Sequence, residues 1–123
     1  MITDFREFSA GPDMFGRTFR VEFVWLQTAI SIRHSDSVDV KFFLDDASSR
    51  EEKVIAIMHH HLLDLGRKTG QDIHDGWVMK LAALHLKRMI ESGEDMEKTL
   101  VTMSPRDLDQ AQAELAAAVR TSR

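Results

Sequence analysis

The chain of 123 residues contains no cysteine. This absence excludes disulfide frameworks, cysteine-ligated zinc or iron–sulfur sites and thiol catalysis, and it fits a reducing compartment. The chain also has no apolar stretch near the roughly 20 residues that span a bilayer, and its first residues lack the basic and apolar regions of a secretory signal. We therefore expect a cytoplasmic protein with no membrane partner.

Basic residues are fewer than acidic ones, with 16 lysines and arginines against 20 aspartates and glutamates, which gives a net charge of −4. A duplex-binding domain usually presents a strongly basic face, because neutralisation of phosphates supplies most of its affinity. The basic residues of this chain are scattered instead of clustered. We therefore expect no nucleic-acid partner.

Familiar catalytic signatures are also missing. The sequence has no glycine-rich phosphate loop, no nucleophile elbow and no paired-histidine zinc pattern. A chain of this length fits one domain, which buries roughly two-thirds of its unfolded surface and so has enough core to fold without disulfides or a structural metal. We predict a single domain over residues 1–123, with an N-terminal arm at 1–16, a β-region at 17–44 and a mainly helical part at 49–121.

The β-region is marked by alternation of apolar and polar residues. The alternation is present over residues 19–23 and returns over residues 29–33 and 38–42. Residues 34–37 form a polar cluster that suits a tight connection, so the last two segments predict an antiparallel hairpin. No glycine or proline marks residues 27–28, which form either a turn or the middle of one long strand.

The segment that follows the β-region has two interpretations. Ser48 and Glu51 form a capping-box pattern, and the apolar residues after them follow helical spacing, which predicts one helix over residues 49–68. In the alternative, residues 53–58, which are rich in β-branched side chains, form a fourth strand beside the hairpin. A shorter helix then begins near His60. We prefer the single helix.

Two further helices are predicted in the C-terminal half. Asp72 can cap a helix that runs to Ser92 and ends at Gly93, and this helix is apolar around most of its circumference. It is therefore expected to be central and buried. Ser104 and Pro105 begin the final helix, with serine as the cap and proline at the first position.

Together these elements predict an α+β fold. The N-terminal half forms an antiparallel sheet of three strands, or of four if residues 53–58 are extended. The sheet packs against about three C-terminal helices. Residues 93–103 are expected to form one helical turn that leads into an extended link to the last helix.

The histidines and their neighbouring aspartates are the candidates for metal ligation. His60 and Asp64 are four residues apart on a helix and share one face, while His74 and Asp75 lie at the start of the central helix. Brought together, the four side chains could hold a divalent metal in a small metal-dependent hydrolase. The structural interpretation, as helix-capping and core-edge residues, has more weight because spacing alone is weak evidence.

The favoured hypothesis is a non-catalytic protein-interaction or regulatory module that takes no cofactor. Trp77, Leu81 and Leu84 form a second apolar face on the central helix and are the candidate contact residues, although a core role for them is common. Strand edges and the alanine-rich last helix are further candidate surfaces. We expect the chain to self-associate as a homo-oligomer or to bind an unidentified protein partner.

Overall fold

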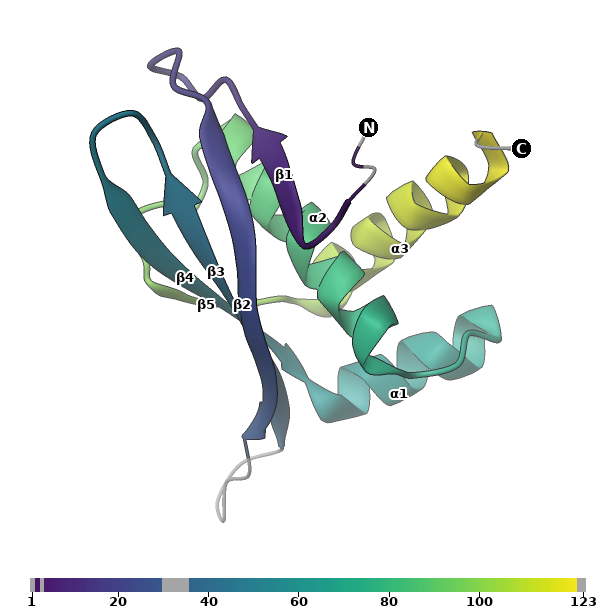
Figure 1. Cartoon of the computed structure of the whole chain (residues 1–123). Coiled ribbons are helices and arrows are strands. Elements are labelled where there is room, and N and C mark those ends of the chain that lie inside the picture. Colours follow the sequence, from purple (N-terminus) through teal and green to yellow (C-terminus); the bar gives the residue numbers. More distant parts are fainter. Residues whose placement is uncertain (1, 3, 30–35, 122–123) are drawn as a thin grey trace.

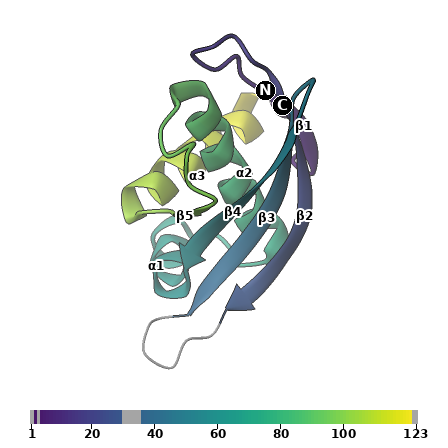
Figure 2. The same cartoon turned by 90° about the vertical axis from the view of Figure 1, so that its left-hand side faces the viewer.

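The computed structural model describes residues 2, 4–29 and 36–121. In this part of the chain five strands form one sheet, in the order β1-β2-β3-β4-β5, and three helices lie against one face of it (Figures 1 and 2). In chain order the elements are β1 (Glu7–Ala10), β2 (Phe19–Ala29), β3 (Ser37–Asp45), β4 (Arg50–Met58), α1 (His59–Thr69), α2 (Asp75–Ser92), β5 (Leu100–Thr102) and α3 (Pro105–Thr121). The α+β class is confirmed. The predicted strand number and the purely antiparallel sheet are wrong, because a fifth strand pairs parallel to β4.

Strands β2 and β3 form the long antiparallel pair at the centre of the sheet. Residues 27 and 28 lie within β2, and Thr28 pairs with Val38, so the long-strand alternative is the correct one. The register shifts between Phe23 and Trp25, which makes Val24 the extra residue of a β-bulge. Residues 30–35, which include most of the predicted strand 29–33 and part of the predicted connection, lie outside the described residues.

The predicted helix over residues 49–68 is wrong, and the alternative is confirmed. Residues 50–58 form β4, which pairs antiparallel with β3, and α1 begins directly after it at His59. The helical spacing in this segment was misleading, because Ile55 and Ile57 also alternate along a strand and both are fully buried. Pairing with β3 satisfies the backbone of this β-branched segment, and tertiary context thereby overrides the local pattern.

The two edge strands were not predicted as strands. In the N-terminal arm, Phe8 and Ala10 are buried, and β1 pairs antiparallel with residues 19–22 of β2. At the other edge, β5 pairs parallel with residues 54–56 of β4, within the segment expected to be an extended link. The range predicted as mainly helical, 49–121, therefore also contains two strands.

Helix α2 is the central helix, as predicted. Most of its apolar side chains are buried between the sheet and α3, and it ends at Gly93, which adopts φ 79° and donates its N–H to the Met89 carbonyl. The predicted N-cap, Asp72, is wrong. His74 is the cap, since its backbone is extended and its Nδ1 accepts the Trp77 backbone N–H at 3.2 Å. None of the described helices is long and apolar enough to cross a membrane.

The predicted start of α3 is confirmed. The Ser104 hydroxyl oxygen accepts the Asp107 N–H at 3.1 Å, and the Asp107 carboxylate accepts the Ser104 N–H at 2.9 Å. This reciprocal pair satisfies two N–H groups at the helix start. Nearby, the buried ammonium of Lys53 donates to the carbonyls of Met96 and Lys98, which fixes the loop that leads into β5.

Candidate functional site

The helices cover one face of the sheet and leave the other open (Figure 2). In β3 every second residue from Val38 to Leu44 is buried, and the residues between them are half-buried. Residues paired across neighbouring strands share a face. The residues of the other strands that are in register with the outward residues of β3 therefore lie on the same face. We call this surface the helix-free face. It consists of Glu7, Ser9, Arg20, Glu22, Trp25, Gln27, Ser37, Asp39, Lys41, Phe43, Asp45, Arg50, Glu52, Val54, Ala56, Met58, Leu100 and Thr102.

One row across this face is largely apolar. The row runs through Trp25, Lys41, Val54 and Leu100, which are aligned in register on four adjacent strands. Leu100 is 58% exposed, whereas the other three side chains are half-buried. Phe43 is the next outward residue of β3 beyond Lys41 and continues the apolar surface. The centre of the helix-free face is therefore an apolar band that water still reaches.

The cation in this row is shielded by aromatic rings. The Lys41 ammonium lies 5.8 Å from the centroid of the Trp25 ring and 5.6 Å from that of Phe43. It also forms a 3.1 Å ion pair with Glu52, and the Lys41 side chain is only 19% exposed. Cation–π contact and a buried methylene stem are both favourable in this geometry. Lys41 therefore adds apolar area to the band and no unpaired charge.

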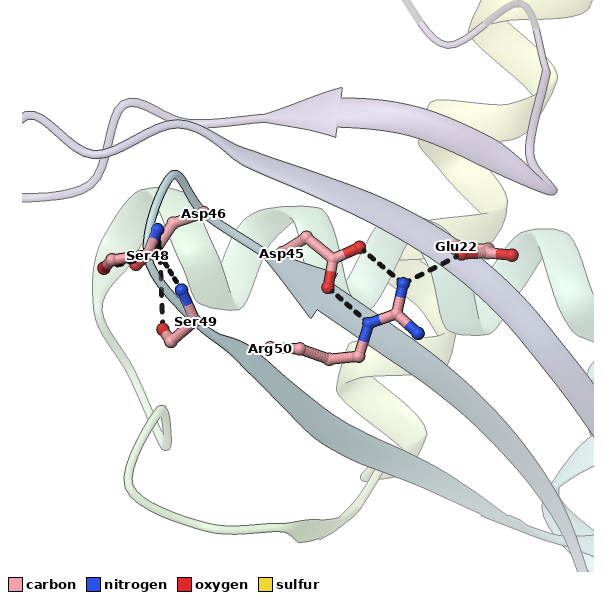
Figure 3. Close-up of polar contacts among 6 residues, drawn as sticks. All are labelled: Glu22, Asp45, Asp46, Ser48, Ser49 and Arg50. Atoms are coloured by element: carbon pink, nitrogen blue, oxygen red, sulfur yellow. Dashed lines mark hydrogen bonds and ion pairs between the residues drawn. The ribbon is translucent and has the colours of Figure 1, made fainter.

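A second cation of the face, Arg50, lies between Asp45 and Glu22 (Figure 3). Its guanidinium makes two hydrogen bonds to Asp45, of 2.7 and 3.0 Å, and an ion pair of 3.7 Å with Glu22. It also lies 4.4 Å from the Phe43 ring centroid. The hydrogen bonds from Arg50 hold the pKa of the Asp45 carboxyl below its ordinary value, and Asp45 raises the pKa of Arg50 in return.

The turn between β3 and β4 fixes the positions of these groups. The Asp46 carboxylate accepts the backbone N–H groups of Ser48 and Ser49, both at 2.8 Å (Figure 3). These hydrogen bonds lower the pKa of Asp46. Ser48 thus belongs to a turn and not to the predicted capping box. The turn aligns Asp45 opposite Arg50 and so sets the register of the pairing between β3 and β4.

The strand edges offer less surface for association than the face does. The outer strands are short, since β1 has four residues and β5 has three. Short edge strands are one of the devices by which proteins limit edge-to-edge pairing. The helix-free face, in contrast, extends over all five strands of the sheet.

The structure does not bring the four predicted metal ligands together. His74 and Asp75 line a cavity of about 320 Å³ at the end of the sheet. Asp64 lines a different cavity, of about 130 Å³, and its carboxylate pairs with Arg67 at 3.5 Å. His60 is exposed on α1 with its ring against that of His61. Across residues 2, 4–29 and 36–121, no group of three or more histidine or acidic side chains is placed to hold a metal ion.

The predicted contact residues on the central helix lie in the core of this chain. Trp77 is 2% exposed, Leu81 is fully buried and Leu84 is buried beside them. The helix-free face was not predicted from the sequence. The helix predicted over residues 49–68 included Val54, so this residue was not expected in the sheet. The alternation over 38–42 already placed Lys41 outward, and this signal would have located the face once β4 was assigned.

No family model matches this chain, and no curated protein or solved structure shows significant similarity to it. Its function is therefore inferred from the geometry and chemistry of its own residues.

Proposed function

We propose that this chain is a non-catalytic interaction module that self-associates by packing the helix-free face of one copy against that of another. The observation that carries the proposal is the row of Trp25, Val54 and Leu100 around the shielded Lys41. Antiparallel sheets often leave one face to water, but that face then carries mainly polar residues. A continuous apolar band on such a face is typical of an interaction surface.

The cations of the face support this proposal because each is already paired with a carboxylate within one copy. Arg20 pairs with Glu7, and Arg50 pairs with Asp45 and Glu22, at the border of the band. Lys41 lies within the band and pairs with Glu52. An unpaired charge would oppose burial strongly, whereas paired charges at a rim change the affinity little. Aromatic residues and arginine are also the types enriched at protein interfaces.

A second copy is the occupant that the face fits best. Two copies related by a two-fold axis place the same patch against itself, so the central apolar row of one copy meets that of the other. The apolar rows can then cover each other while the ion pairs of Arg20 and Arg50 remain at the border. Leu100 is 58% exposed, so within the row its side chain has the most apolar area to remove from water when the face is covered.

Sedimentation velocity across the micromolar range tests the proposal. We expect wild-type protein to dimerise and Leu100→Glu to shift the equilibrium strongly to monomer. A buried leucine contributes about 1.5–3 kcal/mol and occurs twice in a symmetric dimer, so the dissociation constant should rise by at least about a hundredfold. Met14→Glu is the matched control, because Met14 is 71% exposed in the loop between β1 and β2, away from this face.

Two results would overturn the proposal. The first is a wild-type protein that stays monomeric across the whole range. The second is a dimer that Leu100→Glu and Met14→Glu weaken to the same extent, which would place the contact elsewhere. Circular dichroism of both variants shows that the fold is retained, as expected for substitutions at exposed positions.

A further inference from the structure

A cavity of about 360 Å³ lies between the loop that joins α1 to α2, the first half of α2 and the middle of α3. Gln71, His74, Lys80 and Gln112 supply the polar side chains of its lining. No residue of the lining belongs to the helix-free face, so the cavity is separate from the surface proposed for self-association. Its volume is within the range of small-molecule sites.

The hydrogen bond between Trp77 and Gln112 determines which atoms Gln112 offers to the cavity. The indole nitrogen can only donate, so the atom that it meets at 2.8 Å is the side-chain oxygen of Gln112. The amide nitrogen of Gln112 keeps two N–H donors, and no protein acceptor bonds to it in the described part of the chain. There, the buried side-chain atoms without a partner belong to His61 and His85, so the Gln112 amide nitrogen is reached by water.

His74 offers a donor for a similar reason. Its Nδ1 accepts the backbone N–H of Trp77 at 3.2 Å, so the proton of the neutral ring is on Nε2. His74 is exposed, and it lines both this cavity and the one at the end of the sheet. Trp77 therefore occupies one acceptor atom of His74 and one of Gln112 and leaves the N–H groups of both side chains unused.

Lys80 supplies the positive charge of the lining. Its ammonium lies 5.6 Å from the centroid of the Phe5 ring. Among the described residues, it is the one lysine whose ammonium has no carboxylate or carbonyl partner. The Lys80 side chain is half-buried on α2, so an anion in the cavity can contact an unpaired ammonium.

The neighbouring carboxylates do not line this cavity. On α3, Asp109 and Glu114 are each paired with a basic side chain of another helix. At the start of α2, Asp72 is exposed to solvent and Asp75 lines the cavity at the end of the sheet. Exposed charges act on a ligand through water that screens them, whereas Lys80 can contact the ligand directly. The charge that a ligand meets in the cavity is therefore positive.

We propose that this cavity binds a small organic monocarboxylate that has an apolar body. The carboxylate accepts hydrogen bonds from the Lys80 ammonium and the Gln112 amide, and the Nε2 N–H of His74 is a further donor on the loop side. Trp77 and Leu115 supply apolar surface for the body of the ligand. A single cation favours a monoanion over a dianion such as phosphate, because the second charge of a dianion would be left unpaired.

A titration with sodium benzoate, followed through the two indole N–H signals by NMR at constant protein concentration, tests the proposal. The spectrum of Trp25→Phe assigns the signals. We expect a saturable shift of the Trp77 signal, because its acceptor Gln112 contacts the ligand. The Trp25 signal should stay in place, because Trp25 lies on the helix-free face.

Two further probes separate the charge of the ligand from its body. Benzamide has the same ring without the charge, and acetate has the charge without the ring. Each should bind at least about tenfold more weakly than benzoate, since benzamide loses the charge-assisted bond and acetate loses the apolar contact.

Variants test the two donors. Gln112→Glu keeps an acceptor for the Trp77 indole but replaces the amide donor with a carboxylate oxygen, so it should abolish benzoate binding while the fold is retained. Lys80→Met keeps the apolar stem and should weaken binding at least about tenfold. Lys87→Met is the matched control on the same helix, because Lys87 pairs with Glu91 and does not line the cavity. It should leave the affinity unchanged.

Several results would each overturn the proposal. They are the absence of a saturable shift of the Trp77 signal, equal affinities for benzoate and benzamide, equal losses in Lys80→Met and Lys87→Met, and an unchanged affinity in Gln112→Glu. A shift of the Trp25 signal alone would place the binding site elsewhere. Stronger binding of inorganic phosphate than of benzoate would contradict the monocarboxylate assignment.

Discussion

The indole nitrogen of Trp77 donates a 2.8 Å hydrogen bond to the side-chain oxygen of Gln112, and this bond joins α2 to α3. Trp77 is almost fully buried, so its N–H has little access to water. A buried indole N–H usually finds a protein acceptor, and Gln112 provides it here. The tryptophan that could have marked a protein contact instead connects two helices of its own chain.

We predict that Gln112→Leu destabilises the protein by about 1–3 kcal/mol, because the indole N–H is left buried without an acceptor. Urea denaturation followed by circular dichroism measures the change. In a Trp77→Phe background, which lacks the donor, the same substitution should cost much less. An equal cost in both backgrounds would show that Gln112 contributes through packing and not through this bond.

Lys53 provides a second test of the fold. Its buried ammonium is the partner of the Met96 and Lys98 carbonyls, so Lys53→Met should leave both carbonyls without a donor and cost about 1.5–3 kcal/mol. Amide exchange should also become faster in β5. Lys98→Met is the control, because the Lys98 side chain is 57% exposed in an ion pair with Asp95. Similar losses in the two variants would refute the structural role of Lys53.

The buried His85 predicts a specific dependence of stability on pH. Burial lowers its pKa in the folded state, whereas the unfolded chain keeps the ordinary value of about 6.5. As the pH falls below that value, the unfolded state takes up a proton that the folded state does not, so the contribution of His85 to stability decreases. Stability should therefore fall between pH 7.5 and the lower folded-state pKa.

His85→Leu isolates this effect from the other titrating groups. The variant should be more stable than wild type by about 1–3 kcal/mol, because an unsatisfied imidazole is replaced by an apolar side chain. The difference should grow as the pH is lowered, and denaturation curves at several pH values measure it. A difference that is constant with pH would mean that His85 has no lowered pKa.

Local patterns predicted several elements correctly because their causes are local. Ser104 and Pro105 begin α3, and Gly93 ends α2 in the left-handed conformation that glycine adopts readily. The alternation over 38–42 likewise predicted the two faces of β3. In each case the residues that decide the conformation are within a few positions of one another.

The wrong predictions concern segments that long-range pairing decides. Residues 50–58 fit either a helix or a strand by their own pattern, and only the adjacent β3 makes them a strand. The short edge strands are similar, because Phe8 and Val101 become part of a sheet only when a neighbouring strand accepts them. Asp72 was an acceptable cap by type, but the loop after α1 places His74 at the helix start.

The sequence by itself determined the α+β class, the buried central helix and the absence of cysteine chemistry, since composition and short-range periodicity suffice for these. Only the tertiary structure decided that Trp77 is core, that Trp25 and Leu100 share an open face, and that His85 lines the same cavity as Arg106 and Asp107. Such neighbours are distant in the chain. Their contact depends on the register of the sheet and the packing of helices, which no local pattern encodes.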